Sequence, residues 1–311
     1  MDSEPAAIGL VGAGRMGSIH LEALRRADGV RLAGVVEPVE LTRARLARNG
    51  TATYASVDEL LASSAPDGVL IAAPSDQHSQ LIARFAAAGV AILCEKPVGV
   101  SVEQARAAAA ATANGRVPLQ VGYWRRFVPE LQALKQRIAA GELGQIIQLG
   151  CFQWDHELPS EAFRSHSGGI AVDMGVHEFD QARWLLGQEF EGICATPAGS
   201  SRERPGDDPD HATILASMSA GSAVVVSLGR RFPHEDSCWV EVWGTDGHER
   251  LEFMWDTSGQ RVFADAMVRQ AEAFARTLSG CPGEGAGADD AVVALTVAGR
   301  AANALAASAA R

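Results

Sequence analysis

The fold of this chain is indicated by the stretch AAIGLVGAGRMG, residues 6–17. An apolar run of strand length, Ala6 to Val11, leads directly into a G-x-G-x-x-G hexamer, and an amphipathic segment, Ser18 to Arg26, follows the last glycine. In this strand-turn-helix context the glycines let backbone approach a pyrophosphate, and the helix N-terminus faces its negative charge. The stretch therefore predicts a dinucleotide-binding βαβ unit, with a plain tight turn as the alternative.

The same alternation of apolar strands and amphipathic helices continues to about residue 122, which is typical of βαβ units on a parallel sheet. The expected strands are Ala6–Val11, Arg31–Val36, Gly68–Ala73, Val90–Cys94 and Val117–Val121. The expected helices are Ser18–Arg26, Val57–Ser63, Gln77–Ala88 and Val102–Ala113. We predict an α/β fold class that begins with a doubly wound parallel sheet, a Rossmann domain, over residues 1–122.

The pattern changes after Gly122, where extended runs dominate and two hairpin-like turns, residues 219–221 and 245–247, join neighbouring runs. The expected strands are Gln145–Trp154, Phe190–Thr196, Ala212–Met218, Ala223–Leu228, Trp239–Trp243 and Arg250–Phe253. The expected helices are Pro129–Ala140, Gly169–Leu186, Ala264–Leu278 and Ala288–Ala309. Residues 123–311 are therefore predicted to form an α+β domain with a largely antiparallel sheet.

Length and composition suit a globular protein of two domains, because 311 residues exceed one ordinary core. The formal net charge of -11 opposes binding to phosphate backbones and anionic lipid. The five cysteines are scattered without a C-x-x-C pair, as expected for thiols in a reducing compartment. The N-terminal residues are acidic, and no run approaches the roughly 18 apolar residues that cross a bilayer. We expect a cytoplasmic protein with no nucleic-acid and no membrane partner.

An acidic residue, Glu37, ends the second expected strand about 20 residues beyond the glycine hexamer. A carboxylate at this place hydrogen-bonds the adenosine ribose hydroxyls and repels a 2′-phosphate. The sequence therefore favours NAD over NADP, although Pro38 and Arg43 nearby keep NADP as an alternative.

A lysine, Lys96, follows the strand Val90–Cys94 within Glu95-Lys96-Pro97. The carboxyl ends of parallel strands are where ligands of such sheets bind. An ammonium there could contact the cofactor ribose and stabilise the developing alkoxide of an alcohol substrate. The alternative is a surface ion pair between Lys96 and Glu95.

The helix expected at residues 169–186 carries Asp173, His177, Asp180 and Trp184 on one face. An imidazole suits proton removal near neutral pH, and a carboxylate one turn earlier can orient it or bind the same substrate. The alternatives are a surface Asp–His pair and a metal site that adds His156 or His166. We expect no metal, because two ligands one turn apart do not complete a zinc site.

Several motifs, taken in order along the chain, resemble those of the glucose-fructose oxidoreductase/inositol dehydrogenase/MocA (Gfo/Idh/MocA) family, and more narrowly its inositol 2-dehydrogenase-like members. The matching pieces are residues 12–17 with His20, Ala73-Pro74-Ser75 with His78, Cys94-Glu95-Lys96-Pro97, residues 120–127, residues 168–187 and residues 241–247. They span almost the whole chain, and their order makes the resemblance specific.

The resemblance implies a second domain with an open-faced sheet that forms a homodimer or homotetramer interface. It implies that Lys96, Asp173 and His177 are catalytic. The residues implied at the cofactor are Gly12, Gly14, Arg15, Met16, Gly17, Glu37, Ala73, Pro74, His78, Glu95, Lys96 and Pro97. The residues implied at the substrate are Lys96, Arg126, Asp155, His156, Asp173, His177 and Asp180.

The function that the resemblance implies is NAD-dependent oxidation of a secondary hydroxyl of a cyclic polyol or sugar to a ketone, within carbohydrate metabolism. His177 would take the hydroxyl proton, Lys96 would offset the transient negative charge, and hydride would pass to the nicotinamide. The alternatives are a sugar reductase, a redox-assisted lyase that retains NAD, and a non-catalytic NAD-binding sensor.

Overall fold

The computed structural model describes residues 4–198, 208–255 and 262–309. The chain forms two compact units. The first contains Met1–Gly99, Glu103–Trp124 and Ala264–Val292, and the second contains Val100–Val102, Arg125–Phe263 and Val293–Arg311. The domain division predicted at residue 122 placed Ala264–Val292 in the second domain, whereas in the structure these residues belong to the first unit. The assignment of substrate binding and oligomerisation to residues 123–311 stays a prediction.

The first unit is built on a six-stranded parallel sheet of order β3-β2-β1-β4-β5-β6. Its strands are β1 (Ala6–Val11), β2 (Val30–Val36), β3 (Thr53–Tyr54), β4 (Gly68–Ile71), β5 (Ala91–Cys94) and β6 (Leu119–Val121). Its helices are α1 (Arg15–Arg26), α2 (Glu40–Arg48), α3 (Val57–Ser64), η1 (Ser75–Gln77, a 3-10 helix), α4 (His78–Ala87), α5 (Val102–Gly115) and most of α10 (Val262–Leu278). The predicted doubly wound parallel sheet is confirmed.

A helix and a strand of this unit, α2 and β3, were not predicted. In α2 only Leu46 is buried, so the sequence has almost no apolar stripe from which this helix could be predicted. β3 has two residues, which is too short for an alternating pattern. Both lie where sequence periodicity carries little information.

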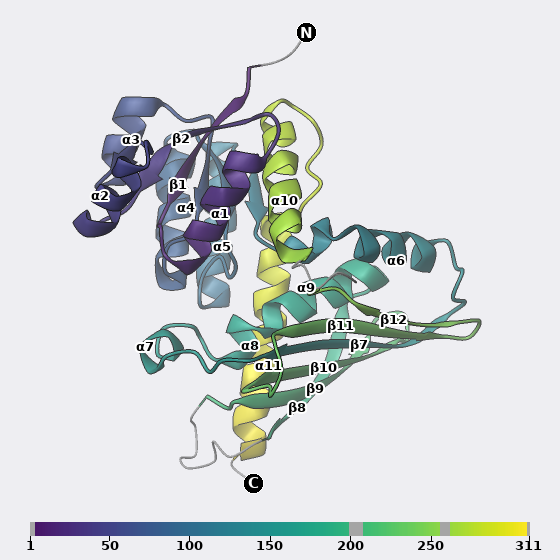
Figure 1. The fold of residues 1–311 in the computed structure, drawn as a ribbon. Coiled ribbons are helices and arrows are strands. Elements are labelled where there is room, and N and C mark those ends of the chain that lie inside the picture. Colours follow the sequence, from purple (N-terminus) through teal and green to yellow (C-terminus); the bar gives the residue numbers. More distant parts are fainter. Residues whose placement is uncertain (1–3, 199–207, 256–261, 310–311) are drawn as a thin grey trace. The chain divides into compact units, whose positions relative to one another are not determined.

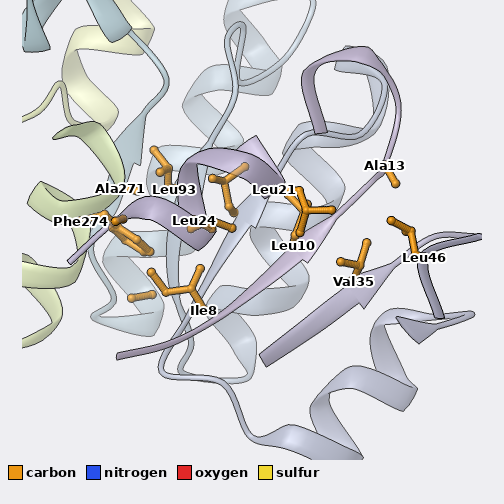
Figure 2. Close-up of a cluster of buried hydrophobic side chains, with 13 residues drawn as sticks. Ile8, Leu10, Ala13, Leu21, Leu24, Val35, Leu46, Leu93, Ala271 and Phe274 are labelled. Atoms are coloured by element: carbon orange, nitrogen blue, oxygen red, sulfur yellow. The ribbon is translucent and has the colours of Figure 1, made fainter. Parts of the chain in front are cut away.

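The core of the first unit joins segments from the two ends of the chain (Figure 2). Ile8 and Leu10 from β1 pack with Leu21 and Leu24 from α1, and Phe274 from α10 belongs to the same cluster. The helix α1 buries this face because its apolar residues recur at helical spacing. Burial of each large side chain stabilises the fold by roughly 1.5–3 kcal/mol.

Replacement of Phe274 by alanine should lower the free energy of unfolding by about 3–5 kcal/mol, because a fully buried ring is lost and a cavity remains. Urea denaturation measures the change. Leu41→Ala is the control, since Leu41 is 84% exposed and its loss should cost no more than about 0.5 kcal/mol. Equal losses in the two variants would contradict the packing of α10 against this sheet.

The second unit contains a six-stranded mixed sheet of order β12-β11-β7-β10-β9-β8 (Figure 1). Its strands are β7 (Ile146–Asp155), β8 (Phe190–Ala198), β9 (His211–Met218), β10 (Ala223–Arg230), β11 (Ser237–Gly244) and β12 (His248–Glu252). Its helices are η2 (Trp124–Phe127, a 3-10 helix), α6 (Pro129–Ala139), α7 (Glu161–Arg164), α8 (Ile170–Asp173) and α9 (Gly175–Leu186). The pairs β9–β10 and β11–β12 are the two predicted hairpins. Only β7 and β10 pair in parallel, so the predicted antiparallel character is confirmed.

The two faces of this mixed sheet differ. Cys151 and Gln153 of β7 contact Gln181 and Arg125, so their face lies under α9 and η2. Phe152 points to the other face, where its ring stacks on Trp239 of β11 with centroids 4.7 Å apart. Alternation along strands therefore separates a buried face under α9 from an aromatic face on the other side.

The last helix, α11 (Ala288–Ala309), belongs in part to each unit. Residues Ala288–Ser308 form the one described helix that is long and apolar enough to cross a bilayer by length and composition alone. A core helix of a soluble protein passes the same test, and Ala294, Ala298 and Ala301 are buried here. The apolar composition of α11 is therefore weak evidence for a membrane span.

Candidate functional site

The glycine hexamer connects β1 to α1, and each of its glycines has a different environment. Gly12 has φ 94°, and a Cβ there would come within 2.7 Å of the Ala72 carbonyl oxygen. A Cβ on Gly17 would come within 2.1 Å of the Gly12 carbonyl oxygen. A Cβ on Gly14 would meet no atom within 4 Å, and no side chain caps the helix that starts next to it. Gly12 and Gly17 thus permit close packing, while Gly14 leaves open space at a helix N-terminus, which fits a pyrophosphate.

Residues Arg15 and Met16, predicted at the cofactor, are the first two residues of α1. Glu37 follows β2 and is 8% exposed. Its Oε2 accepts a hydrogen bond from the Ala13 amide, and its Oε1 accepts one from the Val39 amide, both at 2.9 Å. The structure therefore brings the predicted ribose-binding carboxylate against the glycine hexamer.

The segment after β5 begins with Glu95, which is 6% exposed. Its Oε1 lies 2.6 Å from His20 Nε2, and its Oε2 accepts a hydrogen bond from the Lys96 amide at 3.1 Å. Burial raises the pKa of Glu95. The hydrogen bond and charge of His20, together with the charges of Lys96 and His78, lower the pKa by more than burial raises it, so the net shift is downward. Glu95 is thus a buried carboxylate that holds the Lys96 backbone, and it is no surface group.

Replacement of Glu95 by glutamine should lower the free energy of unfolding by about 1.5–3 kcal/mol at neutral pH, because a charge-assisted buried hydrogen bond is lost. The folded-state pKa lies below the ordinary 4.5, so this stabilisation is complete above about pH 4.5 and declines as pH falls through the folded value. Denaturation at several pH values measures it. Glu284→Gln, at a partly exposed pair with Arg276, is the control and should cost at most about 1 kcal/mol. A loss that stays constant down to acid pH would contradict the assignment.

A second buried histidine, His78, holds the same segment from α4. Its Nδ1 lies 2.7 Å from the Pro97 carbonyl oxygen and its Nε2 lies 2.8 Å from the Ala73 carbonyl oxygen. Pro97 lies in the loop after β5, and Ala73 lies beside Pro74 in the loop after β4. The Lys96–Pro97 peptide bond is cis. Burial is the main reason that the pKa of His78 is lowered. The imidazole therefore joins two loops at the carboxyl ends of neighbouring strands, and these loops contain five of the predicted cofactor residues.

The helix predicted at Gly169–Leu186 is wrong as one element, because the chain forms two helices with Met174 between them. Asp173 ends α8, and His177 lies in the first turn of α9. The interruption is one residue long, and Met174 itself keeps right-handed helical angles, φ -96° and ψ -50°. The expected stripe on one continuous helix is thereby replaced by two short helices that meet between the two predicted catalytic residues.

The surface-pair alternative for Asp173 and His177 is also wrong, because His177 is buried and only 14% of the Asp173 side chain is exposed. The described residues hold no group of three or more His, Cys, Asp or Glu side chains suited to a metal ion. His166 is exposed and bonds to its own helix turn. Trp184 packs under the Lys135 ammonium, 4.8 Å from its ring centre.

Two consecutive arginines of η2 attach this segment to α9. Arg126 binds Asp180 through two hydrogen bonds, of 3.0 and 2.5 Å. Arg125 Nη1 lies 2.6 Å from Glu178 Oε2, and both residues are buried. The structure thus brings together Arg126 and Asp180, which were predicted at the substrate, and adds the Arg125–Glu178 pair, which sequence reasoning missed.

The two remaining predicted residues lie at the end of β7, Asp155 as its last residue and His156 directly after it. Asp155 lies opposite Arg230 in the parallel pair β7–β10, and its Oδ1 accepts a hydrogen bond from Gln153. His156 is exposed, and its Nδ1 lies 2.8 Å from the His234 carbonyl oxygen. Asp155 is therefore at the same strand ends as Arg230, whereas the contacts of His156 belong to the loop after β10.

Arg230 is a site residue that sequence reasoning missed. Its side chain is fully buried, and its Nη2 lies 3.2 Å from Asp173 Oδ2. The available signal was its position two residues beyond the expected strand Ala223–Leu228, in register with the buried residues of that strand. A charged residue in such a position needs a buried partner.

These features define the class of the protein as a dinucleotide-dependent oxidoreductase. A family profile described as an oxidoreductase family with an NAD-binding Rossmann fold matches residues 6–123, and the GFO/IDH/MocA C-terminal domain matches residues 131–249. The chain belongs to the GFO/IDH/MocA family. Its predicted membership, its NAD cofactor and its activity as an oxidoreductase are confirmed.

Individual relatives cover nearly the whole chain. The Rhizopine catabolism protein MocA of Rhizobium meliloti is 47% identical over 292 residues, which are 94% of this chain and 92% of that protein. An inositol 2-dehydrogenase of Rhizobium meliloti (strain 1021) is 32% identical and covers 84% and 80% of the two chains. The crystal structure of a putative myo-inositol dehydrogenase from Sinorhizobium meliloti 1021 has a TM-score of 0.89 at 29% identity, over 97% and 98% of the chains.

Proposed function

We propose that this protein is an NAD-dependent dehydrogenase that oxidises a secondary hydroxyl of an inositol-like cyclic polyol to a ketone. The observation that carries the proposal is the row of hydrogen-bonding groups in the second unit, along α8, α9 and the ends of β7 and β10. Asp173, His177, Asp180, Arg126 and Asp155 offer carboxylate, imidazole and guanidinium groups. A polyol has many hydroxyls that donate and accept hydrogen bonds, and such a set of groups can orient it.

The relatives support the same reaction. An inositol 2-dehydrogenase and a scyllo-inositol 2-dehydrogenase (NAD(+)) are 32% and 34% identical to this chain. Two other relatives also have myo-inositol dehydrogenase names. Each of these alignments covers about three quarters or more of this chain. The inferred activity therefore rests on similarity in both units and not on the cofactor-binding unit alone.

The proposal gives each catalytic residue one role. His177 takes the proton of the reacting hydroxyl, Asp173 binds the substrate and polarises that hydroxyl, and Lys96 offsets the negative charge that develops on its oxygen. NAD, when bound, accepts the hydride. The buried partners of Glu95 and His78 keep the backbone of the Lys96 segment in place.

The test is formation of reduced nicotinamide by purified protein with NAD or NADP and with myo-inositol, scyllo-inositol, other inositols, glucose and several aldoses. We expect turnover with NAD and at least one inositol. Turnover only in the direction of ketone reduction would indicate a reductase, and tightly retained NAD without net turnover would indicate a lyase. An NAD-binding protein that turns over none of these substrates in either direction would indicate a sensor.

One observation favours a rhizopine as a second candidate substrate. The identity to the Rhizopine catabolism protein, 47%, exceeds the identity to the inositol 2-dehydrogenase, 32%. The substrate panel should therefore include a rhizopine. A larger kcat/KM for the rhizopine than for any inositol would select this candidate.

We also propose that the protein works in the cytoplasm as a homodimer or homotetramer through the second sheet. The aromatic face of that sheet, away from α9, has stacked Phe152 and Trp239, and Leu215 of β9 is exposed there. Apolar surface of this kind favours association. The five cysteines are free, as suits a reducing compartment. Sedimentation of wild type and Trp239→Glu tests the assembly, since the variant should be monomeric, and cell fractionation tests the location.

A further inference from the structure

The last residue of β10, Arg230, is a fully buried cation with two carboxylate partners. Its Nη1 lies 2.5 Å from Asp208 Oδ2, and its Nη2 lies 3.2 Å from Asp173 Oδ2. A guanidinium without access to water needs such partners, because desolvation of an unpaired charge costs several kcal/mol. The carboxylates of Asp208 and Asp173 therefore offset the cost of burying the Arg230 charge.

The first of these partners, Asp208, holds both ends of α8. Its Oδ1 accepts a hydrogen bond from the amide of Ile170, the first residue of the helix, at 2.6 Å. Its Oδ2 binds Arg230, which in turn binds Asp173, the last residue of the helix. One carboxylate and one guanidinium thus span the four residues from one end to the other.

The helix α8 depends on such external contacts. Four residues form barely one helical turn, which is not stable by itself in water. Two glycines in the left-handed region, Gly168 and Gly169, precede it, and their backbone would be flexible without a fixed partner. A Cβ on Gly169 would lie 3.2 Å from Asp208 Oδ1, so the close approach of this carboxylate uses the glycine.

The next residue in the chain, Arg231, provides a matched comparison for Arg230, because it binds a different carboxylate. Asp210 accepts ion pairs from Arg164 at 2.9 Å and from Arg231 at 3.2 Å, and Arg164 also pairs with Asp208. The side chain of Arg231 is 59% exposed, although it follows Arg230 directly in the chain. Of these two adjacent arginines, only Arg230 contacts Asp173.

We propose that Asp208 and Arg230 are positioning residues that set the carboxylate of Asp173 for the substrate. The contacts run from Asp208 through Arg230 to Asp173, and they fix where α8 ends. This inference rests on the proposed role of Asp173 in the reaction. Misplacement of a reacting or binding group by about 1 Å can cost on the order of 100-fold in rate.

The experiment is a double-mutant cycle that measures kcat and KM for the polyol and Kd for NAD. Arg230→Lys and Asp208→Asn are made in the wild-type background and in an Asp173→Asn background, and Arg231→Lys is the control. Asparagine at 208 keeps an oxygen for the Ile170 amide but loses the charge that pairs with Arg230. Circular dichroism and the thermal midpoint show which variants are folded.

We expect Arg230→Lys and Asp208→Asn to lower kcat/KM by about 10- to 100-fold, with the Kd for NAD unchanged, and Arg231→Lys to retain wild-type values. In the Asp173→Asn background the same two changes should have little further effect, because they act through Asp173. Effects that simply multiply in the two backgrounds would overturn the inference and leave the proposed function intact. An Asp173→Asn enzyme with wild-type kcat/KM would instead refute the role of Asp173, and the inference would fail with it.

Discussion

Replacement of His177 by alanine should lower kcat by about 100- to 10,000-fold, because the proposed base that removes the hydroxyl proton is lost. NAD binding should be unchanged, since the glycine hexamer and Glu37 belong to the first unit. Stopped-flow or steady-state formation of reduced nicotinamide measures kcat, and fluorescence of bound reduced cofactor measures its Kd.

Two further measurements separate the loss of a base from damage to the fold. Added imidazole should restore part of the activity of the alanine variant, because a small base can enter the space of the missing ring. His166→Ala, at an exposed histidine near the start of the same region, should retain wild-type kcat. Near wild-type turnover of the His177 variant would refute its assignment as the base.

The surroundings of His177 explain why it can be fixed without a long helix. Arg125 and Arg126 bind Glu178 and Asp180, which follow His177 by one and three residues in α9. Both pairs are buried, and removal of one partner from a buried pair typically costs about 3–5 kcal/mol. The first turns of α9 are therefore held by buried charges as well as by packing.

Local patterns in the sequence predicted the strands well. The expected strand Ala6–Val11 is observed with the same bounds, and the expected strand Ala223–Leu228 extends to Arg230. Such elements alternate or are fully apolar, and burial on a sheet selects for that pattern directly. The glycine hexamer was equally informative, because its strand-turn-helix context constrains backbone geometry at known positions.

Contacts between distant positions were not predictable in the same way. Arg230 and Asp173 are 57 residues apart, and Arg125 and Glu178 are 53 apart (178 minus 125). No local periodicity links such pairs, and a charged residue inside an amphipathic segment is usually assigned to its exposed face. The interruption at Met174 was missed although Gly175 follows it, because a single glycine inside a helical pattern is often tolerated.

Replacement of Lys96 by alanine should also lower kcat by about 100-fold or more, because the ammonium no longer stabilises the alkoxide that forms during hydride transfer. The chain has only two lysines, Lys96 and Lys135, so Lys135→Ala is a matched control. Lys135 packs over the Trp184 ring, and its loss should change stability by at most about 1 kcal/mol and leave kcat unchanged.

The scarcity of lysine also allows a chemical test of the same residue. In a Lys135→Arg variant, Lys96 is the only ε-amine of the chain, so an amine-selective reagent reports on it alone apart from the N-terminus. Modification of Lys96, identified by peptide mass spectrometry, should abolish turnover. If the ammonium faces the cofactor, saturating NAD should slow the modification reaction. Full activity after complete modification would refute a catalytic role for Lys96. Inactivation at a rate that NAD does not change would be consistent with a role of Lys96 at the substrate and would refute its contact with the cofactor.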